Sequence, residues 1–175
     1  ADMRMAWFNA RGNASPTYLV NFGILYVQAD ALLKADSVFS QYIKLAPDSI
    51  YGYDWKGRVN LTIDSTMTVE PYVTEFVTNY QKALEIAFTD KTRYKSQGTK
   101  AALYLAGYFN NIKKSRDSAL MYVVKGHEID STNAQLKSIK EIFDRQPAKG
   151  TNQKPPAKAA SSKPSASIRK PGSKV

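Results

Sequence analysis

The sequence contains no cysteine and only one histidine, His127, among its 175 residues. The missing thiols exclude disulfides and thiolate nucleophiles, and a zinc site would have to be built almost entirely from carboxylates. Glu128 follows His127 directly, but neighbouring helix residues point about 100° apart, so this carboxylate is poorly placed to orient the imidazole as a base. We therefore interpret His127 as a partly exposed residue near the end of a helix.

The other motifs of catalytic and nucleotide-binding sites are missing as well. No G-x-G-x-x-G or Walker pattern occurs, and the carboxylates are scattered over expected helix surfaces and caps, as at Asp36, Glu75 and Asp117. No basic side chain has a defensible place beside a serine, threonine or lysine nucleophile. The sequence therefore predicts no catalytic residue, no cofactor and no metal ligand, and we expect a protein that is not an enzyme.

Long apolar runs are also missing. No stretch of about 18 apolar residues is present, so we expect no transmembrane segment. No basic region followed by an apolar run opens the chain, so no targeting signal is visible. The first residue, Ala1, is compatible with an excised fragment. Both a reducing cytoplasm and a bacterial periplasm tolerate a chain without cysteine, so the localisation stays open.

Acidic residues are absent from the last part of the chain. Residues 147–175 hold seven of the 25 basic residues, which leaves 18 basic against 15 acidic residues in 1–146. The net charge of +10 is therefore concentrated in the tail, and the charge of the remainder is no argument for a specific nucleic-acid partner.

The tail, residues 146–175, is rich in Ala, Lys, Pro and Ser, and Ile168 and Val175 are its only large aliphatic residues. Such a segment cannot bury enough apolar area to offset its ordering entropy, so we expect it to be disordered. It could serve as a solubilising linker, or it could attach weakly to nucleic acid, an anionic membrane or a cell-wall polymer. Without aromatic residues, such anionic contacts would be unspecific and sensitive to salt.

Two segments of the remaining chain repeat one another without a gap at an offset of 84 residues. The first carries, in order, Leu19, Gly23, Ala35, Phe39 and Pro47. The second carries in the same places Leu103, Gly107, Ala119, Val123 and Ser131. A fixed internal period of this kind indicates a repeat architecture.

These positions resemble the tetratricopeptide repeat (TPR), a unit of about 34 residues that forms two antiparallel helices. The resemblance implies that Gly23 and Gly107 lie where the first helix of a pair approaches the second too closely for a larger side chain. It also places Ala35 and Ala119 at the same crossing. The implied fold class is all-α, a right-handed α-solenoid of antiparallel helix pairs. In composition the chain is similar to the multi-repeat TPR proteins of Bacteroidetes bacteria.

A middle repeat fits the pattern less well. Gly57 follows Gly23 by 34 residues, but extra residues lengthen the turn around 63–69 and a linker over 89–99. Glu70 and Pro71 restart a helix, with the proline in its first turn. We expect a partial helix of a preceding repeat over 1–14, and about three repeats with a C-terminal capping helix over 15–145.

The resemblance further implies a concave groove lined by the first helix of each pair, which would hold a peptide or a partner's helix. The expected groove residues are Val20, Ile24, Tyr51, Asp54, Arg58, Tyr104, Tyr108 and Ile112. Tyrosine and arginine are common at binding hot spots. The alternative is that these side chains only pack against the N-terminal helix or against neighbouring repeats.

One TPR subclass binds the acidic C-terminal tails of chaperones with Lys, Asn and Arg side chains. The matching positions here are Val20, Ile24, Trp55, Ala101 and Leu105, none of which forms charge-assisted bonds to a carboxylate. We therefore expect no binding of such tails. The sequence favours a non-catalytic scaffold with a protein or peptide partner, and the alternative function is an anionic-polymer tether that acts through the basic tail.

Overall fold

The computed structural model describes residues 16–145, and the predictions for 1–14 and 146–175 lie outside this range. The described residues form helices and no strand. The helices are α2 (Pro16–Gln28), α3 (Leu32–Leu45), α4 (Ile50–Ile63), α5 (Tyr72–Thr89), α6 (Lys95–Asn111), α7 (Arg116–Ile129) and α8 (Ala134–Arg145).

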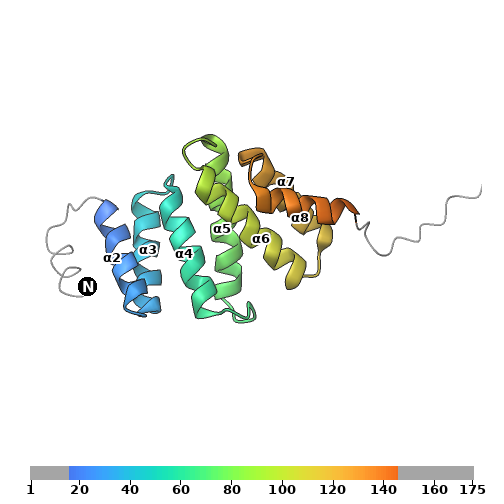
Figure 1. The fold of residues 1–175 in the computed structure, drawn as a ribbon. Helices are drawn as coiled ribbons and strands as arrows, with labels where there is room; N and C mark the ends of the chain where they lie inside the picture. Colours follow the sequence, from blue (N-terminus) through green and yellow to red (C-terminus); the bar gives the residue numbers. More distant parts are fainter. Residues whose placement is uncertain (1–15, 146–175) are drawn as a thin grey trace, which may run out of the picture.

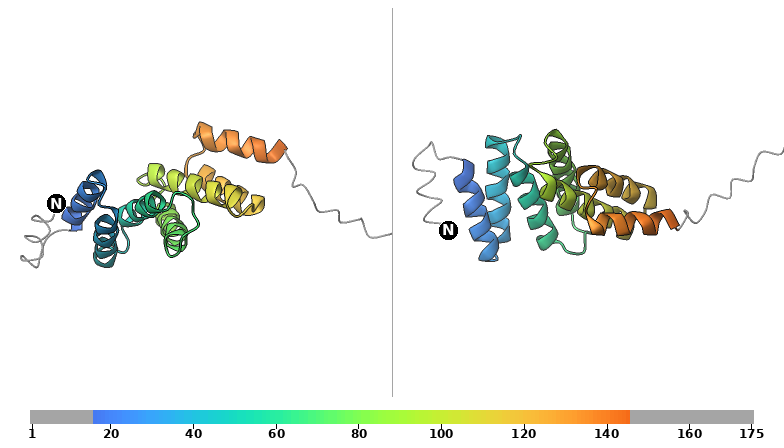
Figure 2. Two further views of the ribbon diagram at one scale, coloured as in Figure 1. Left: turned by 90° about the horizontal axis from the view of Figure 1, so that it is seen from below. Right: turned by 45° about the horizontal axis from the view of Figure 1, so that its top comes forward.

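Each helix packs against the next one along the chain (Figure 1). Three antiparallel pairs, α2–α3, α4–α5 and α6–α7, follow one another in an elongated row, and α8 lies against α7 at the end of the row (Figure 2). This arrangement confirms the predicted all-α fold of stacked helix pairs.

The helices form because their apolar residues recur at helical spacing. In α3 the buried residues are Ala35, Val38, Phe39 and Tyr42, which follow the pattern i, i+3, i+4, i+7. In α5 the buried positions recur in the same way along its 18 residues, from Val73 to Ala87. Most of the stability of such helices comes from burying this face against the neighbours in the row.

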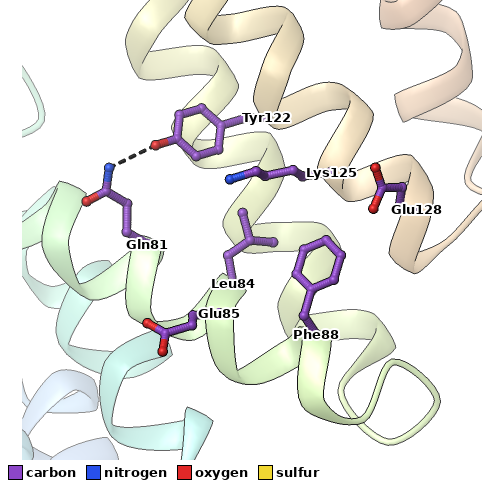
Figure 3. Close-up of a pocket in the computed structure, with 7 residues that line it drawn as sticks. All are labelled: Gln81, Leu84, Glu85, Phe88, Tyr122, Lys125 and Glu128. Atoms are coloured by element: carbon purple, nitrogen blue, oxygen red, sulfur yellow. Dashed lines mark hydrogen bonds between the residues drawn. The ribbon is translucent and has the colours of Figure 1, made fainter.

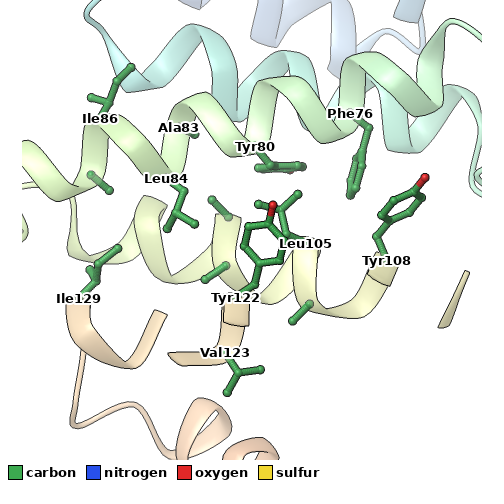
Figure 4. Close-up of a cluster of buried hydrophobic side chains, with 14 of the residues drawn as sticks. Phe76, Tyr80, Ala83, Leu84, Ile86, Leu105, Tyr108, Tyr122, Val123 and Ile129 are labelled. Carbon is green, nitrogen blue, oxygen red and sulfur yellow. The ribbon is translucent and has the colours of Figure 1, made fainter. Parts of the chain in front are cut away.

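The buried apolar side chains divide into two clusters. The N-terminal cluster lies between α2, α3 and one side of α4, and it consists of Leu19, Phe22, Tyr26, Ala35, Val38, Phe39, Tyr42 and Val59. The C-terminal cluster extends from α4 to α8 and is centred on α5 and α6 (Figure 4). Its fully buried large side chains include Tyr80, Phe76, Leu105, Val123 and Leu136.

A group of polar side chains, here called the polar junction, joins α3 to α5 across α4. Its members are Asp36, Ser40, Lys56, Asn60, Glu75 and Asn79. The Lys56 ammonium, whose side chain is 10% exposed, lies 2.8 Å from an Asp36 oxygen and 3.0 Å from a Glu75 oxygen. Asn60 donates to both of these carboxylates and accepts from Asn79, so the charged groups of the junction are hydrogen-bonded on several sides.

Close helix approaches occur at two of the three glycines on which the repeat alignment rests. A methyl group at Gly23 would overlap the Phe39 ring, and one at Gly57 would lie 2.7 Å from the Tyr80 ring. At Gly107 it would meet no atom within 4 Å. The prediction of a close helix crossing is therefore confirmed at Gly23 and wrong at Gly107.

The misplacement at Gly107 results from one extra residue in the loop of the third pair. Three residues, 29–31, connect α2 to α3, whereas four residues, 112–115, connect α6 to α7. The offset of 84 therefore holds for the second helices, and an offset of 83 holds for the first helices. The buried Ala106, not Gly107, takes the place of Gly23.

The middle pair is lengthened as expected at the first of two predicted places. Eight residues, 64–71, connect α4 to α5, and α5 begins at Tyr72, directly after Pro71. The predicted linker over 89–99 is mostly wrong, because α6 begins at Lys95 and only 90–94 connect the two helices. Gly98 and Thr99 are buried within α6, where Gly98 faces Ala87 and Ile129.

Candidate functional site

A groove runs along α6, between α4 and α8, and consists of two adjoining hollows. The apolar hollow, of about 210 Å³, is lined by Leu61, Met67, Phe76, Leu103, Tyr104, Gly107, Tyr108, Asn111 and Ile112. The polar hollow, of about 310 Å³, is lined by Arg58, Lys100, Leu103, Tyr104 and Gln135. Leu103 and Tyr104 line both hollows, so the two lie side by side.

Tyr104 forms the ridge between the hollows, and its ring is held by two aromatic contacts from α5. It stacks on Tyr80, with ring centroids 4.9 Å apart, and meets Phe76 edge-on at 6.4 Å. The residue is nevertheless 36% exposed. An aromatic ring that is fixed on one side and open on the other loses little conformational entropy when a partner covers it.

Arg58 and Lys100 give the polar hollow its positive charge. Arg58 is held by Asp54, with 3.0 Å between Nη2 and Oδ2, and by the Trp55 ring, whose centroid lies 4.9 Å from the guanidinium carbon. Burial raises the pKa of Asp54, and the Arg58 cation opposes this shift. Lys100 is exposed and forms no ion pair within residues 16–145. Arg58 is thus paired with a carboxylate at contact distance, whereas Lys100 acts on Asp54 only beyond ion-pair distance.

The hydroxyl of Tyr80 lies beneath this site. The side chain is fully buried, and no described residue meets hydrogen-bond geometry with its hydroxyl, although the Arg58 guanidinium lies near it. Burial raises the pKa of Tyr80 far above its ordinary value, and the nearby Asp54 carboxylate adds to this shift. Tyr80 is therefore a neutral phenol, and its ring supports Tyr104.

Only part of the predicted groove is brought together. Arg58, Tyr104, Tyr108 and Ile112 line the two hollows, although Tyr108 is only 6% exposed and belongs to the C-terminal cluster. Asp54 is buried beside Arg58 and contributes charge from below the surface.

The other predicted residues line neither hollow. Tyr51 is exposed in the first turn of α4, away from both. Val20 and Ile24 are half-buried and pack on the N-terminal cluster. The groove that the structure describes is thus confined to α4, α6 and α8, with Met67 from the α4–α5 connection and Phe76 from α5.

Sequence reasoning missed Lys100, Leu103 and Gln135. Lys100 directly follows the segment expected to be a linker, 89–99, and was not assigned to a helix face. Lys100, Leu103, Tyr104 and Gly107 follow the spacing i, i+3, i+4, i+7 and therefore share one face of α6. This spacing would have identified them if the start of α6 had been known.

A third hollow, of about 570 Å³, lies outside the groove, on the side of the row formed by the second helices of the pairs, α5 and α7 (Figure 3). Leu84, Phe88 and Tyr122 give it an apolar lining, while Glu85, Lys125 and Glu128 add both signs of charge. Gln81 donates a hydrogen bond of 2.8 Å to the Tyr122 hydroxyl across the gap between the helices. Its mixed charges favour no particular class of ligand.

Residues 16–145 contain neither a metal-binding cluster nor a membrane-spanning helix. No three His, Asp or Glu side chains there lie close enough together to hold a metal ion. None of the helices in this range is long and apolar enough to cross a membrane.

Comparison with known proteins supports the fold. No known family model and no curated protein matches the sequence. Among solved structures, the chain is similar to the C-terminal part of a TPR repeat-containing protein from Cytophaga hutchinsonii, a member of the Bacteroidetes. The two share 24% sequence identity with a TM-score of 0.63, and the match covers 72% of this chain and 47% of the other. The fold is therefore TPR-like, and this chain spans about half the length of the solved chain that it matches.

Proposed function

We propose that the protein is a non-catalytic scaffold that binds a peptide or a helix of a partner protein in the groove along α6. TPR-like folds generally mediate protein–protein interaction, and residues 16–145 show no constellation of catalytic side chains. The observation that carries the proposal is Tyr104, whose ring is packed on Tyr80 and open to solvent between two hollows.

The test is selection of binding peptides from a displayed random library on the intact protein, followed by calorimetry with the selected peptides. Tyr104→Ala removes the ridge, and we expect it to weaken binding at least about tenfold, as is usual for an aromatic hot spot. Tyr51→Ala is the matched control, because Tyr51 has a similar exposure but lies outside the groove. Selected peptides that bind both variants as tightly as the wild type would contradict the proposal.

The concentration of basic charge in the tail supports a second candidate function, attachment to an anionic polymer. The tail lies outside the described residues. Retention on an anionic matrix at low salt should then fall when 147–175 are deleted, and it should collapse as salt rises. Binding through the groove should survive moderate salt and depend on Tyr104. Unchanged retention of the shortened chain would remove this second function.

A further inference from the structure

We propose that the groove selects a peptide segment in which a bulky apolar side chain lies next to a carboxylate, with the apolar side chain seated over Gly107 and the carboxylate facing Lys100. The proposal rests on the proposed function and specifies its partner: a segment of another protein that pairs an aromatic or aliphatic residue with a neighbouring Asp or Glu.

The apolar hollow has space for one large side chain. A methyl group at Gly107 would meet no atom within 4 Å, although Gly107 lies inside a helix that is otherwise packed against α4, α5 and α7. This opening exists because Ala106 occupies the helix crossing, which leaves Gly107 on the groove side of α6. The hollow, of about 210 Å³, has room for a leucine or phenylalanine side chain.

The surroundings of this hollow favour an apolar occupant. Phe76 and Tyr108 form its floor, and Leu61, Leu103 and Ile112 add aliphatic surface. Asn111 is the only amide side chain that lines it. Water held there has few partners, so its displacement by an apolar side chain is favourable.

The polar hollow favours a negative charge. Arg58 and Lys100 line it, and no carboxylate lines either hollow. Asp54 is buried and bonded to Arg58, and Lys100 acts on it only beyond ion-pair distance, so the exposed Lys100 ammonium can still pair with a carboxylate of a ligand. Gln135 of α8 adds an amide at the same place, which suits the backbone or carboxylate of a bound segment.

The two subsites are adjacent, because Leu103 and Tyr104 separate them and line both. The apolar residue and the acid of the ligand must therefore be close in its sequence or one helical turn apart. The apolar contact should supply most of the affinity. Pairing of a carboxylate with an exposed lysine should contribute up to about fivefold in affinity, and should therefore act mainly in selection.

The experiment uses an array of end-capped nonapeptides that place Leu, Phe, Trp or Ala at the centre and Glu, Gln or Lys at each neighbouring position. The full chain is the binding protein, and affinities of the strongest peptides are measured in solution. We expect binding to require Leu, Phe or Trp at the centre of the peptide. Affinity should fall in the order Glu, Gln, Lys at the flanking position. Lys100→Glu should reverse this order, whereas Lys137→Glu, an exposed charge change that lines neither hollow, should leave it unchanged.

Gly107→Leu fills the apolar hollow and provides the second readout. It should abolish binding of every array peptide without lowering the denaturation midpoint, because the added side chain enters empty space. Peptide binding that depends on Tyr104 but shows no charge preference would overturn this inference and leave the proposed function intact. Binding that ignores both Gly107→Leu and Tyr104→Ala would overturn both, and so would the failure of every array peptide and every library to bind.

Discussion

Two of the three glycines in the third helix pair have opposite surroundings. Gly126 of α7 is buried, and a methyl group on it would lie 2.7 Å from the Cβ of Ala102 in α6. Gly107 of α6 faces the open apolar hollow. A glycine in a helix costs stability relative to alanine, and only a close contact of the Gly126 kind offsets this cost.

The two glycine-to-alanine substitutions should therefore have opposite effects. Gly126→Ala forces α6 and α7 apart and should lower the free energy of unfolding by about 1–3 kcal/mol. Gly107→Ala should raise it by up to about 1 kcal/mol, because alanine has the higher helix propensity. Chemical denaturation of both variants measures the difference, and a loss of stability in Gly107→Ala would show that the space beside Gly107 is not open.

The buried hydroxyl of Tyr80 allows a second prediction for a single residue. Because this hydroxyl has no hydrogen-bond partner among the described residues, its burial costs free energy that a phenylalanine ring does not. Tyr80→Phe should therefore leave stability unchanged or raise it by about 1 kcal/mol, as measured by thermal or chemical denaturation. A loss of more than about 1 kcal/mol would show that the hydroxyl is bonded, through an ordered water or through Arg58.

The helix pairs could be predicted from the sequence, because Gly23, Ala35 and Phe39 lie at the spacing of one close crossing. The register of α6 could not be predicted from the same pattern. Alanine precedes glycine at 106–107, so an ungapped alignment matched the wrong small residue and hid the extra loop residue. The groove was predicted only in part because α6 begins earlier than expected, at Lys95, so that Lys100 was not assigned to the helix face that carries Tyr104.

At the scale of elements, the long connection between α4 and α5 is organised by one carboxylate. Asp64, at the end of α4, accepts backbone hydrogen bonds of 3.2 Å from Thr66 and of 2.7 Å each from Thr68 and Val69. The Thr66 hydroxyl also donates to it. These bonds hold the pKa of Asp64 below its ordinary value near 3.8, and the bond from the Thr66 hydroxyl contributes most to this shift.

This shift predicts an acid-sensitive connection. A carboxyl whose pKa is depressed by folding stabilises the folded state above its unfolded pKa, and the contribution is lost as pH falls through the folded value. Asp64→Asn should therefore be less stable than the wild type at neutral pH, and the gap should close below about pH 3.8, the ordinary value of the carboxyl. Denaturant titrations of both proteins between pH 2 and 7 measure the gap, and a gap that is independent of pH would contradict the assignment.

At the scale of the whole molecule, the two apolar clusters meet at the polar junction, where Lys56 balances Asp36 and Glu75. Lys56→Met keeps a side chain of similar length but leaves the two carboxylates without their shared cation. Removing one partner of a buried ion pair costs about 3–5 kcal/mol, and the partial exposure of Asp36 and Glu75 places the expected loss at the lower end, about 3 kcal/mol.

Chemical denaturation checks this loss, and hydrogen exchange locates it. Amide protection should fall most in α3, α4 and α5, which the junction connects. Lys82→Met is the matched control, because Lys82 pairs with Glu85 on an exposed surface, and its loss should lower stability far less than the loss of Lys56. Equal losses in the two variants would show that the junction is no stronger than an exposed ion pair.

Lys56 also lies two residues from both Asp54 and Arg58, which places it on the opposite side of α4 from the groove. Its bonds to α3 and α5 therefore fix the rotation of α4 about its own axis. A turn of α4 by a single residue, about 100°, would remove the ammonium from both carboxylates, whereas apolar side chains could repack after such a turn. The direction in which Arg58 projects is thus determined by a lysine that no ligand in the groove would touch.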